Sequence, residues 1–297
     1  MRARGALLLK AKLSLLPVLL ASCTACSFFR TPLTYGEAEL FYPQITTVRP
    51  ELLDRRNVEV SLPDGNTLRG IAMVRPNPRA TFIYFGGNAE HAQSATTKIT
   101  QWAETYNVNV IFVDYRGYGA STGAPALKHL ASDALAIYDG TTRFHGTAPI
   151  FVIGFSLGSL SATHLAANRP LSGLVLMAPV SSFSDSDMYP KEQKRRLLPR
   201  YKAPLARWAN MRPAFEVPDG LEPMNNIGQV HAPLLLMHGN EDQIIPAKCG
   251  MNVYNKAKGK KTLLLMQGLG HNDLSLTSGQ GAEYMAKFVD ECLDLGY

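Results

Sequence analysis

The sequence predicts an α/β fold in which a mostly parallel sheet of about eight strands carries helices on both faces and a cap insertion. Three patterns indicate this fold. A β-hairpin comes first, short apolar runs without polar alternation follow it, and helical stretches separate most of those runs. Runs that are apolar throughout are typical of parallel strands buried on both faces of a sheet. The 297 residues are enough for one such domain.

The elements follow one another in a regular order from residue 58 onwards. Residues 58–62 and 68–74 flank the turn sequence Pro63-Asp64-Gly65-Asn66, a combination that favours a hairpin. The predicted strands after the hairpin are residues 81–85, 108–113, 150–155, 173–177, 234–237 and 262–266. The predicted helices lie near residues 90–105, 126–144, 157–168, 247–258 and 280–294. Strands joined by crossover helices pair in parallel, so this order predicts a parallel sheet after the hairpin.

The regular spacing is interrupted between residues 180 and 233. About 50 residues separate two predicted strands there, far more than a usual connection with one helix. Residues 181–230 are therefore predicted to form an insertion over one end of the sheet. Residues 191–212 within it contain eight basic residues and one acidic residue, interleaved with leucine and aromatic side chains. Two interpretations remain open: a cap that meets anionic lipid or an acidic substrate, or a solvated lid that covers the pocket.

Composition and charge exclude several classes of protein. Hydrophobic residues make up 46% of the chain and charged residues 18%, which argues against a disordered, collagen-like or coiled-coil protein. The net charge is +6, but four of the 30 basic residues lie within the first 12 positions. Without those four, 26 basic residues face 24 acidic ones, so no nucleic acid partner is expected. No cysteine or histidine cluster has metal-ligand spacing, so no metal and no cofactor are expected.

The N-terminus has the pattern of an export signal. A basic start is followed by an apolar stretch at residues 13–21, the order that is typical of a secretory signal peptide. This stretch is much shorter than the roughly 20 apolar residues needed to cross a membrane. The segment Leu20-Ala21-Ser22-Cys23 resembles the bacterial lipobox, which implies removal of residues 1–22 and lipidation of Cys23.

The predicted lipid would attach the protein to a membrane surface without spanning it. Residues 23–50 would then be a tether and lead-in, whose three prolines discourage regular structure, and residues 51–297 would form the α/β domain. Thr24 in place of aspartate resembles lipoproteins of the outer membrane, so we expect a bacterial cell-envelope protein on its periplasmic side. The alternative is cleavage near Ala25, which would leave a soluble periplasmic protein. Such an exported chain could pair Cys249 with Cys292, although nothing in the spacing requires it.

The segment Gly154-Phe155-Ser156-Leu157-Gly158 is a G-x-S-x-G motif in a specific structural context. It follows a predicted apolar strand and opens a predicted helix, which is the setting of a nucleophile elbow. The serine of such an elbow lies at a tight turn, so small residues are needed two positions to either side. The N-terminus of the following helix favours negative charge near the serine oxygen. Ser156 is therefore the predicted nucleophile.

A serine nucleophile needs a base and an acid that orients the base. Both are expected in loops that follow strands, because such loops lie at the carboxyl edge of a parallel sheet beside the serine. The loops after the last two predicted strands contain Asp242 and His271, which we predict to be the acid and the base. Glu241 and Asp273 are the alternatives for the acid. His238 is expected to be a strand-end histidine with local hydrogen bonds.

An oxyanion hole requires two backbone N–H donors. Leu157, directly after the nucleophile, is expected to supply one. The loop Gly86-Gly87-Asn88-Ala89 follows the strand at residues 81–85 and is expected to supply the other, because its glycines let the backbone approach the reacting carbonyl. Asn88 is the predicted donor, with Gly87 as the alternative.

Taken together, these motifs resemble the α/β-hydrolase superfamily, and in particular its bud-emergence-protein-like or serine aminopeptidase-like branch. The resemblance extends in order over residues 58–295 and implies the α/β-hydrolase fold, with Ser156, Asp242 and His271 as the triad. The chain departs from the usual His-Gly-Asn-Ala sequence of this branch by having Gly86 in place of the histidine. We expect this difference to change how the oxyanion loop is braced.

The sequence thus predicts a serine hydrolase that cleaves a carboxylic ester or thioester through an acyl-enzyme intermediate. The expected substrate is a small-molecule or lipid acyl ester. A lipase or phospholipase, or an amidase or peptidase of the same fold, is the alternative among enzymes. A lipoprotein that uses the fold as a non-catalytic binding module is the alternative outside them.

Overall fold

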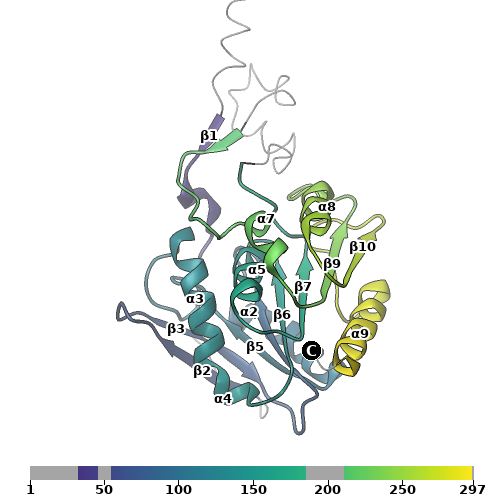
Figure 1. The fold of residues 1–297 in the computed structure, drawn as a ribbon. Helices are drawn as coiled ribbons and strands as arrows, with labels where there is room; N and C mark the ends of the chain where they lie inside the picture. The colour runs from purple at the N-terminus through teal and green to yellow at the C-terminus, as the bar shows by residue number, and fades with distance from the viewer. Residues whose placement is uncertain (1–32, 46–54, 185–210, 296–297) are drawn as a thin grey trace, which may run out of the picture.

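A computed structural model of the chain describes residues 33–45, 55–184 and 211–295, and its centre is an eight-stranded sheet (Figure 1). The strand order is β10-β9-β7-β6-β4-β5-β3-β2, in which only the β2–β3 and β3–β5 pairs are antiparallel. The strands are β2 (Arg55–Ser61), β3 (Thr67–Met73), β4 (Thr81–Phe85), β5 (Asn109–Val113), β6 (Ile150–Phe155), β7 (Gly173–Met177), β9 (Leu234–Gly239) and β10 (Lys261–Met266). The predicted mostly parallel sheet with its leading hairpin is confirmed, and the strand boundaries differ from the prediction by only a few residues.

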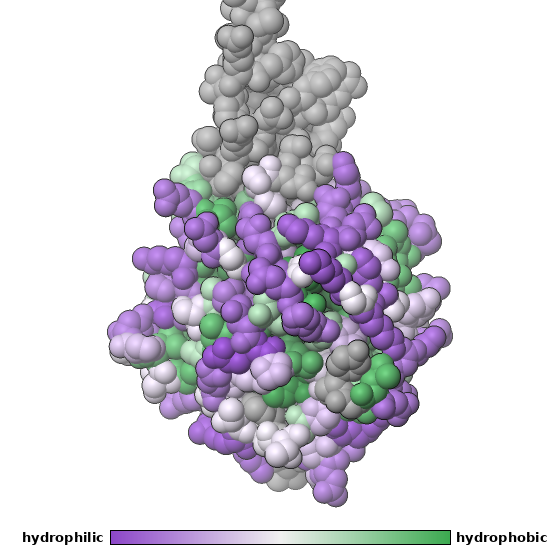
Figure 2. Space-filling model, viewed as in Figure 1, coloured by the Kyte–Doolittle hydropathy of each residue, from purple (hydrophilic) through white to green (hydrophobic). Residues whose placement is uncertain are grey.

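Helices cover both faces of the sheet and divide the core into two layers. Helices α2 (Ala92–Tyr106) and α9 (Gly279–Asp294) bury their apolar sides on one face. Helices α3 (Leu127–Gly140), α5 (Gly158–Asn168) and α8 (Ala247–Lys256) cover the other. Successive strand residues alternate between the two layers, as Ile83 and Tyr84 do in β4. The face shown in Figure 2 is mostly hydrophilic, with apolar residues in small separate groups.

The predicted helix near residues 126–144 is interrupted. It forms α3 and a separate short helix α4 (Thr142–His145). Gly140 is a poor helix residue, and the hydroxyl group of Thr141 donates to the carbonyl oxygen of Ile137 at 2.6 Å. Such a bond to the i−4 carbonyl weakens a helix and often bends it, and α3 ends beside it.

The lead-in before the domain has more structure than its prolines predict. Strand β1 (Leu33–Tyr35) pairs in parallel with β8 (Met211–Pro213), and these two strands lie outside the main sheet (Figure 1). A 3-10 helix, η1 (Glu37–Leu40), follows, and Phe41 is buried in the core beneath α3. Long-range pairing and burial outweigh the local preference of the prolines, so residues 33–45 pack onto the domain.

The insertion is described at its two ends, residues 181–184 and 211–230. Its C-terminal part contains β8, the short helix α7 (Pro223–Asn226) and a 3-10 helix, η4 (Ile227–Gln229). Basic residues 191–210, the signal segment 1–22 and Cys23 lie outside the described residues. Over the described ranges, no helix is both long and apolar enough to cross a membrane.

Cys249 and Cys292 are buried free thiols. Cys249 belongs to the core layer under α8, and Cys292 belongs to the layer under α9 on the other face of the sheet. The sheet therefore separates them, and they do not form the disulfide that an exported chain could contain. Burial also raises the pKa of the Cys292 thiol to about 11, which keeps it protonated at neutral pH.

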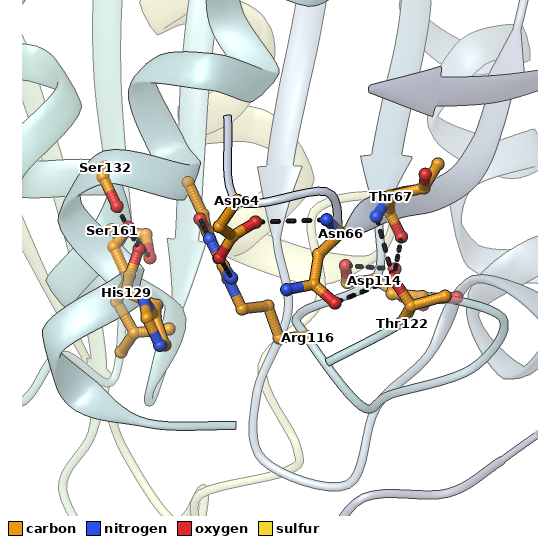
Figure 3. A network of polar contacts seen from close by, with 12 residues as sticks. Asp64, Asn66, Thr67, Asp114, Arg116, Thr122, His129, Ser132 and Ser161 are labelled. Atoms are coloured by element: carbon orange, nitrogen blue, oxygen red, sulfur yellow. Dashed lines mark hydrogen bonds and ion pairs between the residues drawn. The ribbon is translucent and has the colours of Figure 1, made fainter. Parts of the chain in front are cut away.

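A buried ion-pair network fixes the loop after β5 (Figure 3). The guanidinium group of Arg116 binds both carboxylate oxygens of Asp133 on α3, at 2.8 and 2.9 Å, and also contacts Asp64 in the hairpin turn. The hydrogen bond from Arg116 lowers the pKa of Asp64 to about 2. Arg116 thus joins the hairpin to α3 and has a structural role.

Candidate active site

Ser156 lies at the turn between β6 and α5 with a φ of +52°, a left-handed conformation that is unusual for a serine. The turn is possible because neighbouring glycines allow close backbone packing. A Cβ atom on Gly154 would lie 2.6 Å from the Cβ of Ala162, and one on Gly158 would overlap the carbonyl oxygen of Phe85. This strand–turn–helix geometry is that of a nucleophile elbow.

The structure brings Ser156, His271 and Asp242 into one hydrogen-bonded chain. The Oγ atom of Ser156 lies 2.9 Å from Nε2 of His271, and Nδ1 of His271 lies 2.7 Å from Oδ2 of Asp242. All three side chains are buried. Because an ionised carboxylate can only accept, Nδ1 carries the proton and Nε2 accepts from the serine hydroxyl. This is the arrangement in which a histidine can act as general base.

The carboxylate of Asp242 is saturated with donors. Its Oδ1 accepts the backbone N–H groups of Ile244 and Ile245, both at 2.8 Å. Its Oδ2 accepts from His271 and lies 3.3 Å from Nε2 of His238. Burial alone would raise the pKa of Asp242, but the hydrogen bonds from His238, His271 and the backbone outweigh it and keep the pKa well below its usual range. Asp242 is therefore ionised at neutral pH and can accept the hydrogen bond from Nδ1 of His271.

The two alternative acids lie elsewhere. The carboxylate of Asp273 accepts the N–H of Gly270 at 2.7 Å, so it closes its own loop. The side chain of Glu241 is exposed to solvent. His238 has the local bond that was expected, from Nε2 to the carbonyl oxygen of Ile245 at 2.8 Å. Its second contact, to Asp242, was not predicted. The two residues are four positions apart, and whether their side chains meet depends on the conformation of the turn after β9.

Hydrogen-bond partners separate the two candidate oxyanion donors in the loop after β4. The N–H of Gly87 donates to Oε2 of Glu90 at 3.0 Å and is therefore occupied. The N–H groups of Asn88 and Leu157 have no acceptor among the described residues. A Cβ atom on Gly87 would lie 3.7 Å from the Cβ of Ser156, so the loop passes beside the serine. The pattern favours Asn88 and Leu157 as the donor pair.

Glu90 takes up the space that Gly86 leaves free. Its Oε2 accepts from the N–H of Gly87 and from the hydroxyl of Tyr84 at 2.6 Å, and its other oxygen pairs with Lys98. A Cβ atom on Gly86 would lie 2.8 Å from that same Oε2. A side chain at position 86 would therefore collide with the carboxylate. The glycine and the glutamate form one bracing arrangement, which is how the loop is supported without the histidine that the resemblance led us to expect.

A cavity of about 450 Å³ adjoins the elbow, and its size is in the range of small-molecule sites. Its lining includes Gly87 and Asn88 of the loop after β4 and Asn272, which directly follows His271, but none of the three side chains of the hydrogen-bonded chain. Its wall combines aromatic and apolar side chains with polar ones. The ring of Phe155 lines the cavity and also contacts the imidazole of His271, with 5.1 Å between the two ring centroids.

The sheet order, the helices on both faces and the nucleophile elbow are those of the α/β-hydrolase fold. Residues 76–223, about half of the chain, match the family described as serine aminopeptidase, S33. The Pyrococcus furiosus esterase Pf2001 superposes with a TM-score of 0.61 at 18% identity, over 88% of this chain and 98% of the esterase. A putative hydrolase from Agrobacterium vitis has a TM-score of 0.59 at 20% identity, over 82% of this chain and 100% of the other. At these identities the superpositions establish the fold alone.

Relatives of similar sequence occur in both animals and bacteria. Human α/β hydrolase domain-containing protein 17B is 26% identical over 218 residues, which is 73% of this chain and 68% of the human protein. An uncharacterized protein of Mycobacterium tuberculosis is 32% identical over 194 residues, or 64% of this chain and 62% of the relative. The chain thus spans about two thirds or less of the length of these relatives.

Proposed function

We propose that this protein is a serine hydrolase that cleaves a carboxylic ester or thioester, with Ser156, His271 and Asp242 as its catalytic triad. One observation carries the proposal: the continuous hydrogen bonds from Ser156 to His271 to Asp242, beside two backbone N–H groups that have no acceptor in the described structure. A buried serine with a positive φ is a strained arrangement, and such strain is typical of functional sites.

The proposed reaction proceeds by acyl transfer. Nε2 of His271 takes the proton of Ser156 while Oγ attacks the carbonyl carbon, and the resulting oxyanion accepts from the N–H groups of Leu157 and Asn88. His271 then gives this proton to the leaving alcohol or thiol as its bond to the acyl carbon breaks. Water attacks the acyl-enzyme, His271 takes one proton from the water and returns it to Oγ, and the carboxylic acid leaves. Asp242 remains ionised throughout and stabilises the imidazolium.

Ester cleavage is favoured over peptide cleavage, because a peptidase would need groups that bind a peptide terminus and the described site offers no evident set. The proposed substrate is a small-molecule or lipid acyl ester.

The test is hydrolysis of p-nitrophenyl esters from acetyl to palmitoyl by the purified full chain in detergent, with Ser156→Ala alongside. We expect turnover by the wild type and a loss of at least about a thousandfold in the variant. The optimum in acyl length separates a small-ester hydrolase from a lipase. A fluorophosphonate probe should label the wild type and not the variant. Full activity or full labelling of Ser156→Ala would contradict the proposed mechanism.

We further propose that the protein is a lipoprotein of the bacterial cell envelope, attached to the membrane surface through Cys23. The support is the order of basic start, short apolar stretch and lipobox-like Leu20-Ala21-Ser22-Cys23. The test is metabolic labelling with radioactive palmitate and membrane fractionation. Cys23→Ala should abolish both label and membrane recovery, whereas the matched control Cys26→Ala should retain them. Labelling that persists in Cys23→Ala would refute the assignment.

A further inference from the structure

The side chain of Asn88 is tied to the N-terminal lead-in. Its Nδ2 donates to the carbonyl oxygen of Leu40 at 2.7 Å, and its Oδ1 accepts the N–H of Tyr42 at 2.9 Å. The same Oδ1 accepts from the hydroxyl of Tyr118 at 2.7 Å. The Tyr118 oxygen also lies 3.0 Å from the N–H of Tyr42, which closes a small network between the lead-in, Asn88 and the loop after β5. The two partners in the lead-in are 48 and 46 residues away from Asn88 in the chain.

The lead-in is firmly attached to the domain. Phe41, between the two residues that bind Asn88, is only 6% exposed and packs in the core layer under α3. The carbonyl oxygen of Gln44 accepts the N–H of Gly119 at 2.7 Å. The carboxylate of Glu37 accepts the N–H of Leu127 at the start of α3 at 2.6 Å. We call residues 37–45 the strap, because they run across the domain with contacts on both sides of Asn88.

The oxyanion loop needs such external support. Two glycines precede Asn88, which leaves this part of the backbone free to adopt several conformations. Ala89, which follows it, has a φ of +64°, a conformation that persists in an alanine only when its surroundings enforce it. Glu90 holds the N–H of Gly87, but it does not contact Asn88 itself. In the described structure, every hydrogen bond of the Asn88 side chain, apart from one with its own neighbour Ala89, is to the strap or to Tyr118.

We propose that the strap is a positioning element for catalysis: through Leu40 and Tyr42 it holds the side chain of Asn88, and thereby aims the Asn88 N–H at the oxyanion. This inference rests on the proposed function. It assigns Leu40, Tyr42, Phe41 and Tyr118 an effect on turnover, although none of them reaches the nucleophile. It also connects the segment that follows the proposed lipid anchor directly to the catalytic loop.

The expected effect falls on turnover more than on substrate binding. An oxyanion contact forms only in the transition state, so its loss lowers kcat and leaves KM nearly unchanged. Loss of an oxyanion donor costs about 10²–10³ in kcat in other enzymes, and a misaimed donor should cost less than a missing one. We therefore expect a decrease of about tenfold for Tyr118→Phe and about a hundredfold for Asn88→Ala.

The first test compares hydroxyl groups in the full chain. Tyr118→Phe retains the buried ring and removes only the hydroxyl group that donates to Asn88. The control, Tyr138→Phe, removes a hydroxyl group that donates to the carbonyl oxygen of Pro170, beyond the C-terminal end of α5. We expect Tyr118→Phe to lower kcat and Tyr138→Phe to leave it unchanged. Tyr118→Phe combined with Asn88→Ala should be no slower than Asn88→Ala alone. Unchanged kcat in Tyr118→Phe and Asn88→Ala, or effects that multiply in the double variant, would overturn the proposal.

The second test perturbs the strap itself. Phe41→Ala and Phe288→Ala remove phenylalanines of similar exposure, 6% and 7%, from opposite faces of the sheet. Both should lower the unfolding temperature, but below that temperature only Phe41→Ala should lower kcat and the rate of fluorophosphonate labelling. Equal kcat in the two variants would refute the strap's role.

The outcome for Ser156→Ala separates the two proposals. If Ser156→Ala is inactive and the strap variants turn over normally, only the strap inference fails. If the wild type shows no turnover and no labelling that depends on Ser156, the proposed function fails and the inference fails with it.

Discussion

Asp114 is a buried carboxylate whose titration should be visible in the stability of the whole domain. It lies at the end of β5, is 1% exposed, and accepts the N–H of Ala92 at the start of α2 at 2.6 Å. Its second oxygen accepts the N–H of Ala120 at 3.4 Å. Burial raises the pKa of Asp114 to about 6, and these backbone bonds only partly oppose that rise. No basic side chain contacts this carboxylate in the described structure.

The direction of the effect follows from the two protonation states. In the unfolded chain the carboxyl group has the ordinary pKa of 3.8, whereas in the folded protein its pKa is about 6. Between these values the native state binds more protons than the unfolded state, so the free energy of unfolding falls as pH rises. The difference of about two pKa units corresponds to roughly 3 kcal/mol. This stability is fully present below about pH 4 and is lost by about pH 6.

The perturbation is Asp114→Asn, which removes the titration and retains an oxygen for the N–H of Ala92. Urea denaturation of both proteins at intervals from pH 3 to pH 7 gives the free energy of unfolding of each. The free energy of unfolding of the wild type minus that of the variant should fall by roughly 3 kcal/mol from pH 3 to pH 7, with most of the fall between pH 4 and pH 6.

Asp139→Asn provides a control of opposite sign. The ion pair with Arg169 lowers the pKa of Asp139, so its carboxylate adds stability that is lost as pH falls below its unfolded value. A difference between wild type and Asp114→Asn that is constant with pH would refute the reasoning about Asp114.

Three further substitutions test the packing around the site. Gly158→Ala places a methyl group against the backbone of β4 and should lower the free energy of unfolding by about 1–3 kcal/mol or more in denaturant titration. Arg116→Met leaves Asp133 buried without its cation and should lower the free energy of unfolding by about 3–5 kcal/mol. Adding Asp133→Leu to this variant should restore part of that loss; if it restores none, the ion-pair explanation is wrong. Glu90→Ala releases the N–H of Gly87 and should lower kcat about tenfold without changing KM, whereas Glu90→Gln keeps an acceptor and most of the activity. Equal kcat in both Glu90 variants would contradict the bracing role.

The order of strands and helices could be read from the sequence because its signals are local. The apolar runs that became β4, β6 and β7 lie at the predicted boundaries, since a strand buried on both faces must be apolar along its whole length. The elbow at Ser156 was visible for the same reason: the glycines at 154 and 158 are required by contacts within one strand–turn–helix unit. Where local preferences were balanced, as at Thr141, the prediction of one continuous helix was wrong.

The positions of Asp242 and His271 were inferred from topology. Each follows a parallel strand, and parallel strands end at a common edge, so sequence order alone placed both near Ser156. The choice of Asn88 over Gly87 needed more than this. Both residues are in the predicted loop, and only the hydrogen bond from Gly87 to Glu90 shows which amide is left without an acceptor.

The sequence by itself determined the elements, the parallel sheet and the segments that meet at its edge, because periodicity, turn residues and strand order are properties of neighbouring positions. Only the tertiary structure decided what supports the site. The strap packs on Asn88 although Pro43 within it favours irregular chain, Glu90 occupies the space beside Gly86, and His238 contacts Asp242. These contacts join groups whose residue types carry no signal of their partner. They form only after the sheet has assembled, because buried polar groups must then form hydrogen bonds with the groups that the fold brings next to them.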